Sequence, residues 1–228
     1  TSREADSLAK RGLRECFRRH IDEPRAGGAL IDTLARAVAA APSSQREEAR
    51  SEAVDLAMVL LTAGIETTGN LITNVLHSLA TRPVLWKRIG ADSALRSRVI
   101  EESLRLDSPV RFVPRVAVAD RTIGNAEIRR GDRLIVFLGA ATRDSERWIN
   151  PDRFDRARSR NRHLAFGHGI HFCLGAHLAR VEAEAALTAL RRRFSTLRPG
   201  SAAPILRGPG VLHGFRKLPL IFGDDQIQ

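Results

Sequence analysis

The feature that most constrains this chain is a glycine-rich segment around one cysteine, Phe166-Gly-His-Gly-Ile-His-Phe-Cys-Leu-Gly175. Its glycines permit backbone conformations with positive φ and a close approach to a bulky partner. A strongly helical sequence follows at once, from Ala176 to about Phe194. Cys173 is therefore predicted to lie just before a helix N-terminus, where free N–H groups and the helix dipole favour a thiolate over a thiol.

Two interpretations of this segment need no metal. A cysteine near the start of a helix is commonly buried and inert, and a glycine-rich loop before a helix commonly binds phosphate. A lone thiolate framed by glycines is, however, poorly suited to a disulfide and well suited to binding a metal axially. The second cysteine, Cys16, falls on the apolar stripe of a predicted helix, so we expect it to be a small buried hydrophobe.

The order Phe-Gly-x-Gly-x-His-x-Cys-x-Gly resembles the haem-ligand loop of the cytochromes P450, in which a cysteine thiolate is the axial ligand of the iron. The resemblance implies that Cys173 binds the iron of haem b and that His171 contacts a haem propionate. It also implies that Phe166 packs against the loop and limits solvent near the sulfur, and that nearby N–H groups tune the thiolate. The glycines that would leave room for the backbone at this site are Gly167, Gly169 and Gly175.

A long apolar helix is predicted over residues 45–81, and its middle reads Ala63-Gly-Ile-Glu-Thr-Thr68. Glycine in a helix costs about 1 kcal/mol relative to alanine, and a buried acid must be satisfied, so this stretch needs an explanation. In one interpretation Thr67 hydrogen bonds back to the carbonyl of Ala63 and Glu66 reaches solvent. In the other, the helix opens locally beside a ligand, and the acid and the alcohol pass protons.

This stretch resembles the Ala-Gly-x-Asp/Glu-Thr-Thr motif of the central P450 helix, which crosses the distal face of the haem. The resemblance assigns Ala63 to the haem pocket. It implies that Glu66 and Thr67 deliver protons during oxygen activation. Ile65 stands where bacterial relatives most often have histidine, which is a mild departure from the motif.

A further helix is predicted over residues 93–106, where Glu102 and Arg105 share one face. A solvated surface pair is the simplest explanation and would contribute a few tenths of a kcal/mol. The sequence also resembles the Glu-x-x-Arg helix of the P450s, whose pair is buried behind the haem and joined by a later arginine. Arg153 is the best match for that arginine. We expect these three residues to hold the fold together as a bonded network rather than to act in catalysis.

Residues 110–138 change to strand-like periodicity, with turns predicted at Asp120-Arg121, Gly124-Asn125 and 130–132. The segment Pro114-Arg-Val-Ala117 resembles the P450 strand whose arginine binds a haem propionate. A guanidinium suits a carboxylate, and the resemblance implies this role for Arg115. Arg111 stands where the family usually has a neutral residue, and it is open whether it makes a second contact or is a surface charge.

The formal charge of +11 comes mainly from arginine. A basic chain can bind nucleic acid or an acidic protein. The sequence has no RNP-like aromatic pattern, no zinc-finger spacing and no lysine-rich tail, so we do not expect nucleic-acid binding. The basic run at Arg156–Arg162 has two interpretations, a solvated loop or a docking surface for an acidic electron donor.

No signal peptide is recognisable, and we expect no apolar run that approaches the length of about 18 residues that a membrane span needs. We therefore expect a cytoplasmic protein without a membrane partner. The sequence begins at Thr1 within an apparent helix, so we expect a fragment or a processed product. Because the N-terminal part of the P450 fold is missing, we expect these 228 residues alone to aggregate.

The predicted fold is mainly α-helical with small antiparallel β-sheets (α+β), as one partial P450 domain over residues 1–228. The predicted segments are helices at 3–22, 30–41, 45–81 and 93–106, a β region at 110–138, a meander at 144–165, the haem loop at 166–175, a helix at 176–194 and a C-terminal hairpin at 205–222.

The function implied by the resemblance is that of a haem-thiolate monooxygenase, which inserts one oxygen atom of O₂ into a small organic substrate. Electrons would come from NAD(P)H through a ferredoxin and its reductase. The activity of this chain by itself is an open question. The alternative is a P450-like, non-catalytic accessory protein of a biosynthetic partner enzyme.

Overall fold

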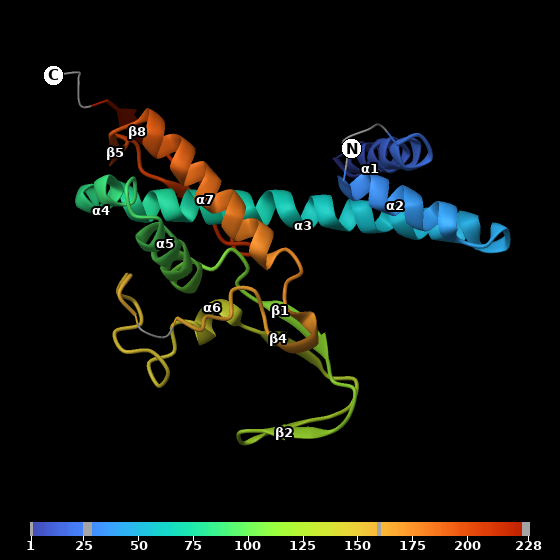
Figure 1. Ribbon diagram of the computed structural model, residues 1–228. Helices are drawn as coiled ribbons and strands as arrows, with labels where there is room; N and C mark the ends of the chain where they lie inside the picture. The colour runs from blue at the N-terminus through green and yellow to red at the C-terminus, as the bar shows by residue number, and fades with distance from the viewer. Residues whose placement is uncertain (1, 25–28, 159–160, 225–228) are drawn as a thin grey trace. The chain divides into compact units, whose positions relative to one another are not determined.

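The computed structural model describes residues 2–24, 29–158 and 161–224 (Figure 1). The fold is mainly helical with small antiparallel sheets, as the sequence predicts. The chain divides into two compact units, Thr1–Glu66 and Thr67–Gln228. Each unit is described by itself below.

The first unit consists of α1 (Ser2–Asp22), α2 (Ala29–Ala40), the short 3-10 turn η1 (Ser43–Gln45) and the first part of α3 (Arg46–Ala80). Ion pairs join α1 to α3, among them Arg14 with Asp55 and Arg50 with Asp22. Cys16 is only partly buried, so it is less enclosed than the apolar stripe predicts. The buried core of this unit is formed by Ile21, Leu34, Val38, Ala53, Val54 and Ala57.

Helix α3 is continuous from Arg46 to Ala80, with no break at Gly64. A window of 18 residues within it has a mean hydropathy of 1.3, so by length and composition the helix could cross a membrane. The expectation that no apolar run approaches this length is therefore wrong, because Glu66 is the one charge in a long apolar stretch. The second part of α3 is instead a core element of the second unit, where Leu71, Val75 and Leu79 are buried.

The second unit packs α3 with α4 (Pro83–Arg88), α5 (Ser93–Leu106) and α7 (Ala176–Arg193). Proline at the first position of α4 suits a helix start, where its missing N–H is not needed. Asp92 caps α5 by accepting a hydrogen bond from the Leu95 N–H at 2.8 Å. The largest buried side chain is Trp86, and its neighbours in the core include Ile89, Leu95, Val99, Ile100, Leu104, Ala183, Leu187 and Leu197.

In the part of the chain that the structure describes, the strands form four antiparallel pairs. The pairs are β1 (Val113–Val116) with β4 (Arg133–Val136), β2 (Arg121–Ile123) with β3 (Ala126–Ile128), β5 (Thr196–Pro199) with β8 (Leu220–Gly223), and β6 (Ile205–Leu206) with β7 (Phe215–Lys217). The turn predicted at Gly124-Asn125 joins β2 and β3, and Gly124 has a φ of 58°. The predicted C-terminal hairpin is correct in part, since β6 pairs with β7 but β8 pairs with β5. A short helix, α6 (Leu138–Ala141), follows β4.

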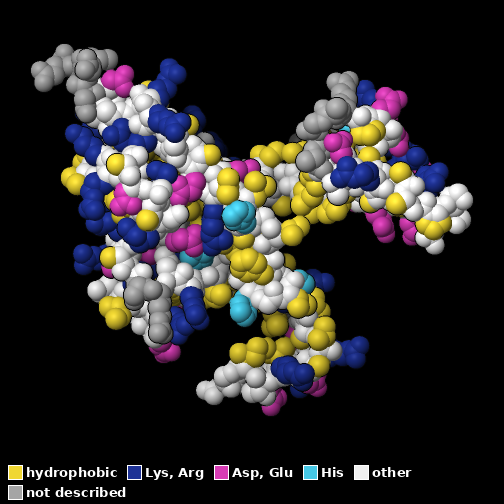
Figure 2. Space-filling view, in the orientation of Figure 1, with side chains coloured by type: hydrophobic (Ala, Val, Ile, Leu, Met, Phe, Trp, Pro, Cys, Tyr) yellow, Lys and Arg dark blue, Asp and Glu magenta, His cyan; other side chains and the backbone are white. Residues whose placement is uncertain are grey.

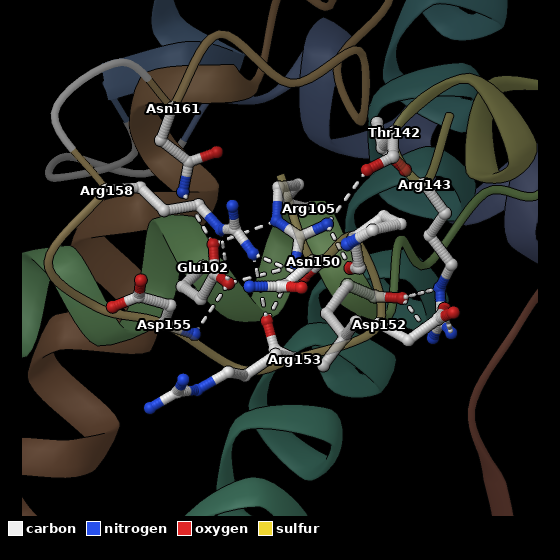
Figure 3. Close-up of polar contacts among 12 residues, drawn as sticks. Glu102, Arg105, Thr142, Arg143, Asn150, Asp152, Arg153, Asp155, Arg158 and Asn161 are labelled. Atoms are coloured by element: carbon white, nitrogen blue, oxygen red, sulfur yellow. Dashed lines mark hydrogen bonds and ion pairs between the residues drawn. The ribbon is translucent and has the colours of Figure 1, made fainter. Parts of the chain in front are cut away.

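Glu102 and Arg105 form a fully buried ion pair on α5 (Figure 3). Nε and Nη2 of Arg105 each donate to one carboxylate oxygen of Glu102 at 2.9 Å. The guanidinium also donates to the main-chain carbonyls of Thr142 at 2.9 Å, Pro151 at 2.7 Å and Arg153 at 3.2 Å. The pair is therefore not a solvated surface pair, and it fastens an irregular segment of the chain to α5.

The second arginine on Glu102 is Arg158, whose Nε donates to the carboxylate at 3.1 Å. The Asp155 N–H at 2.8 Å and the Asn161 amide at 3.2 Å supply further hydrogen bonds. The sequence predicts Arg153 in this role, and the structure corrects that prediction. The side chain of Arg153 is exposed and points away from Glu102, and its main-chain carbonyl is what joins the network (Figure 3).

Glu101, the preceding residue on α5, faces α7. Nε and Nη2 of Arg180 donate to its two oxygens at 2.6 and 3.0 Å, and Nε2 of His163 lies 3.2 Å from one of them. Burial by itself would raise the pKa of Glu101, but the hydrogen bonds and charges of His163 and Arg180 lower that pKa from 4.5 to about 2. This cluster fastens α7 to α5.

Replacing Arg105 by alanine should leave the buried carboxylate of Glu102 without its ion-pair partner on α5. Breaking a buried pair by removing one partner costs about 3–5 kcal/mol, so Arg105→Ala should lower the free energy of unfolding in urea by about this amount. Arg153→Ala is the matched control, because that side chain is exposed, and it should change stability by less than about 0.5 kcal/mol. Equal losses in the two variants would contradict the network as described.

Glu101→Gln tests the second cluster through pH. A carboxylate with a lowered pKa stabilises the fold fully above its ordinary pKa of about 4.3 and loses this contribution as pH falls toward about 2. The variant should therefore be less stable than the parent by about 1–3 kcal/mol at neutral pH. The difference should shrink as the urea titrations are repeated from pH 5 to pH 2. Glu182→Gln, at an exposed position of α7, is the control and should show no such trend.

Candidate functional site

The cysteine loop turns back on itself through main-chain hydrogen bonds. The Cys173 N–H donates to the Phe166 carbonyl at 2.9 Å. Gly167 and Gly169 have φ values of 74° and 69°, which the glycine pattern predicts. Gly175 differs, with a φ of −83° at the start of α7. A Cβ at that position would lie 4.0 Å from the Cys173 sulfur, which is an ordinary van der Waals distance.

The loop presents Cys173 as an exposed, free thiol three residues before α7. Across residues 2–24, 29–158 and 161–224, no group of three or more histidine, cysteine, aspartate and glutamate side chains could hold a metal ion. The remaining coordination sites of a metal bound to this thiol would therefore need ligands that are not side chains of such a cluster. A metal carried in a macrocycle meets that condition, since one protein thiolate then completes the coordination.

Several large apolar side chains of the cysteine loop and of the helix that follows it are exposed. Ile170 is 97% exposed and Leu174 is 85% exposed. Phe172, Leu178 and Val181 are exposed as well. Exposed apolar side chains gathered in this way mark a binding surface. The exposed thiol of Cys173 and the exposed apolar residues near it in sequence therefore fit a large apolar group such as haem.

Phe166 lies beneath the loop and joins the core of the second unit. The Arg180 guanidinium lies 4.5 Å from the centre of its ring, and Phe172 meets the same ring edge-on at 6.4 Å. The pKa of Arg180 is raised, first by its hydrogen bond to Glu101 and further by the charges of Glu101 and Cys173. The sequence did not predict the pairing of Arg180 with Glu101, because the two residues are 79 positions apart in the chain.

Arg115 and His171, the predicted propionate ligands, are both exposed. Arg115 lies on β1, and its Nη1 donates to the Pro114 carbonyl at 2.8 Å. His171 is the last residue of the short 3-10 turn η2 (Gly169–His171). Neither side chain pairs with a carboxylate of the described part of the chain, so both could bind one supplied by a ligand.

Ala63, Glu66 and Thr67 lie on one continuous stretch of α3. Ala63 and Glu66 are exposed and Thr67 is half-buried. Glu66 is the last residue of the first unit and Thr67 the first of the second. The helix does not open at this point, which removes one element of the interpretation as a ligand groove. The proton-relay role of the pair stays a prediction.

Arg111, whose role the sequence leaves open, contacts His213. Its Nη2 lies 2.9 Å from Nδ1 of His213, whose Nε2 lies 3.5 Å from Asp107. The Arg111 N–H also donates to the Val211 carbonyl at 2.7 Å. Arg111 therefore joins the segment before β1 to the loop before β7.

The basic run at 156–162 is not uniformly solvated. Arg158 belongs to the buried network on Glu102, with 10% of its side chain exposed. Arg156 is half-buried and Arg162 is exposed. Arg160 lies outside the described residues. Arg162 is thus the member whose exposure suits a docking surface.

The sequence of this chain is similar to those of known proteins. Residues 13–214 match the family model "Cytochrome P450". The chain is 41% identical over 165 residues to the putative cytochrome P450 YjiB of Bacillus subtilis, a match that covers 72% of this chain and 41% of that protein. It is also 41% identical over 193 residues to cytochrome P450 107B1 of Saccharopolyspora erythraea, covering 83% of this chain and 47% of that protein.

Solved structures agree. CYP109E1 of Bacillus megaterium, in complex with corticosterone, superposes with a TM-score of 0.84 at 31% identity over 97% of this chain and 60% of its own. Ligand-free CYP164A2 of Mycobacterium smegmatis gives 0.81 at 38% identity over 95% of this chain and 55% of its own. The chain thus spans about half the length of these relatives. It belongs to the cytochrome P450 family.

Proposed function

We propose that this chain is the haem-binding part of a soluble bacterial P450 monooxygenase that inserts one atom of O₂ into a small organic substrate. The observation that carries the proposal is the exposed thiol of Cys173, held by a glycine-shaped loop among exposed apolar side chains. Haem b would supply the oxygen-activating chemistry, and thiolate ligation favours cleavage of the O–O bond.

The residues of the second unit would bind and orient the haem. Cys173 would be the axial ligand, and Arg115 and His171 would hold the two propionates by charge-assisted hydrogen bonds. Phe166, supported by Arg180, would keep water away from the sulfur. Gly175 would leave space beside the thiolate, where a side chain would otherwise make contact.

Residues of α3 would move protons. Glu66 is exposed and can exchange protons with water. Thr67 has a hydroxyl that both donates and accepts hydrogen bonds, so it can pass a proton onward. Ala63, with its small side chain, would leave room beside the haem.

The proposed partners follow from the family. Electrons would come from NAD(P)H through a ferredoxin and its reductase, in the cytoplasm, and exposed arginines such as Arg162 suit an acidic donor. Solved relatives hold ligands as different as corticosterone and an acyl carrier protein loaded with a hexadecenoic acid. The proposed substrate is therefore no narrower than a small organic molecule.

Cys173→Ser tests the ligand assignment. The protein should take up haem and, after reduction and addition of carbon monoxide, show the Soret band typical of thiolate ligation. Cys173→Ser should lose that band because a serine hydroxyl does not replace the thiolate. Cys16→Ser, at the other free cysteine, should keep it. Failure of the parent protein to take up haem would contradict the proposal and favour the non-catalytic accessory role.

Thr67→Ala tests the relay. Haem binding should persist, but more of the electrons drawn from NAD(P)H should appear as hydrogen peroxide, with product per O₂ falling by at least about tenfold, since positioned acid–base groups contribute 10²–10⁴-fold. The matched control is Thr62→Ala on the same helix, where the hydroxyl donates to the Met58 carbonyl at 2.8 Å. Full coupling in Thr67→Ala would show that the relay is elsewhere.

A further inference from the structure

A hollow of about 430 Å³ lies in the second unit where the end of α4, the turn into α5 and the last turns of α7 meet. Four of the side chains that line it are basic: Lys87, Arg96, Arg191 and Arg192. Figure 2 shows many lysine and arginine side chains over this part of the molecule. Neither the haem residues nor the relay residues take part in it.

Arg191 is held in place before any ligand arrives. Its Nε donates to the Trp86 carbonyl at 3.2 Å and its Nη1 to the Phe194 carbonyl at 2.9 Å. Gly90 lets the side chain lie against the turn, because a Cβ at Gly90 would be 3.1 Å from Cγ and Nε of Arg191. A guanidinium fixed in this way loses little conformational entropy when it binds.

Arg96 is also fixed, but its charge is matched. Its Nε pairs with Glu184, and its Nη1 donates to the Ile89 carbonyl at 2.7 Å. Glu184 therefore offsets one of the four positive charges. The other carboxylate oxygen of Glu184 accepts a hydrogen bond from the Ser97 hydroxyl at 2.8 Å.

The remaining three charges have no such match. Among the residues that the structure describes, no carboxylate pairs with Lys87, Arg191 or Arg192. Carbonyl oxygens orient Arg191 but do not neutralise it. Like charges that line a concave surface focus the electrostatic potential and attract anions.

We propose that this hollow binds the diphosphate group of a small ligand. Guanidinium groups match phosphate oxygens in pairs, and small-molecule sites commonly measure about 300–1,000 Å³. One phosphate group carries about −1.5 to −2 charges at neutral pH, so two groups are needed to balance the three unmatched cations. None of the described residues that line the hollow is aromatic, so recognition of a nucleobase is not part of the proposal.

Titration calorimetry with pyrophosphate, on the full chain at fixed ionic strength, tests this site without any need for haem. One saturable site is expected, with inorganic phosphate at least about tenfold weaker. ADP should match pyrophosphate within about threefold, because the diphosphate is the shared feature. ADP binding more than about tenfold tighter than pyrophosphate would overturn the assignment to the diphosphate alone.

Two double variants that remove the same charge distinguish binding in the hollow from non-specific attraction of the anion to a basic protein. The double variant Lys87→Gln, Arg192→Gln removes two exposed cations from the hollow and should weaken pyrophosphate by at least about tenfold. Arg216→Gln, Lys217→Gln removes the same charge from exposed positions of β7 and should change affinity by less than about twofold. Equal weakening in both, or no saturable binding at millimolar pyrophosphate, would overturn the proposal.

Discussion

The buried carboxylate of Glu102 is the constraint on which the second unit depends. A carboxylate taken out of water costs several kcal/mol unless charges and hydrogen bonds replace the water. Arg105, on the same helix, supplies two of these bonds. The others come from Asp155, Arg158 and Asn161, so the chain after α6 must fold back over α5 to deliver them. In its described parts, 142–158 and 161–165, this segment has hardly any regular structure, and the network holds the residues that bind Glu102 against α5 (Figure 3).

Successive residues of α5 fasten different parts of the chain. Glu102 binds the irregular segment, whereas Glu101 binds Arg180 of α7. Arg180 in turn lies over Phe166 at the base of the loop. A chain of charged and aromatic contacts therefore leads from α5 to the loop that presents the thiol, and the geometry of that loop depends on polar groups that never touch a ligand.

Periodicity and glycine patterns predicted the regular parts well. The helix expected over 45–81 runs from Arg46 to Ala80, and the positive φ of Gly167 and Gly169 follows from their residue type. Two of the errors concern contacts between segments that are distant in the sequence. The resemblance favours Arg153 as the later arginine that joins Glu102, and this prediction is wrong. Arg158 pairs with Glu102 instead, because the path of the segment decides which side chain turns inward. The pairing of β8 with β5 was missed for a related reason, since pairing between distant strands leaves no local signal.

The two proposed activities, haem binding and proton transfer, involve different elements of the structure. The residues assigned to haem binding, Ala63 aside, lie in the second unit, on the cysteine loop and on β1, which pairs with β4. Successive residues of a helix point about 100° apart, so Glu66 and Thr67 face different surroundings, and Glu66 is exposed while Thr67 is half-buried. In the proposed relay the exposed acid would exchange protons with water and the hydroxyl would pass them on. Ala63 precedes Thr67 by four residues and so shares its face of the helix. The proposed proton delivery would therefore rest on α3, and the proposed haem ligation on the cysteine loop.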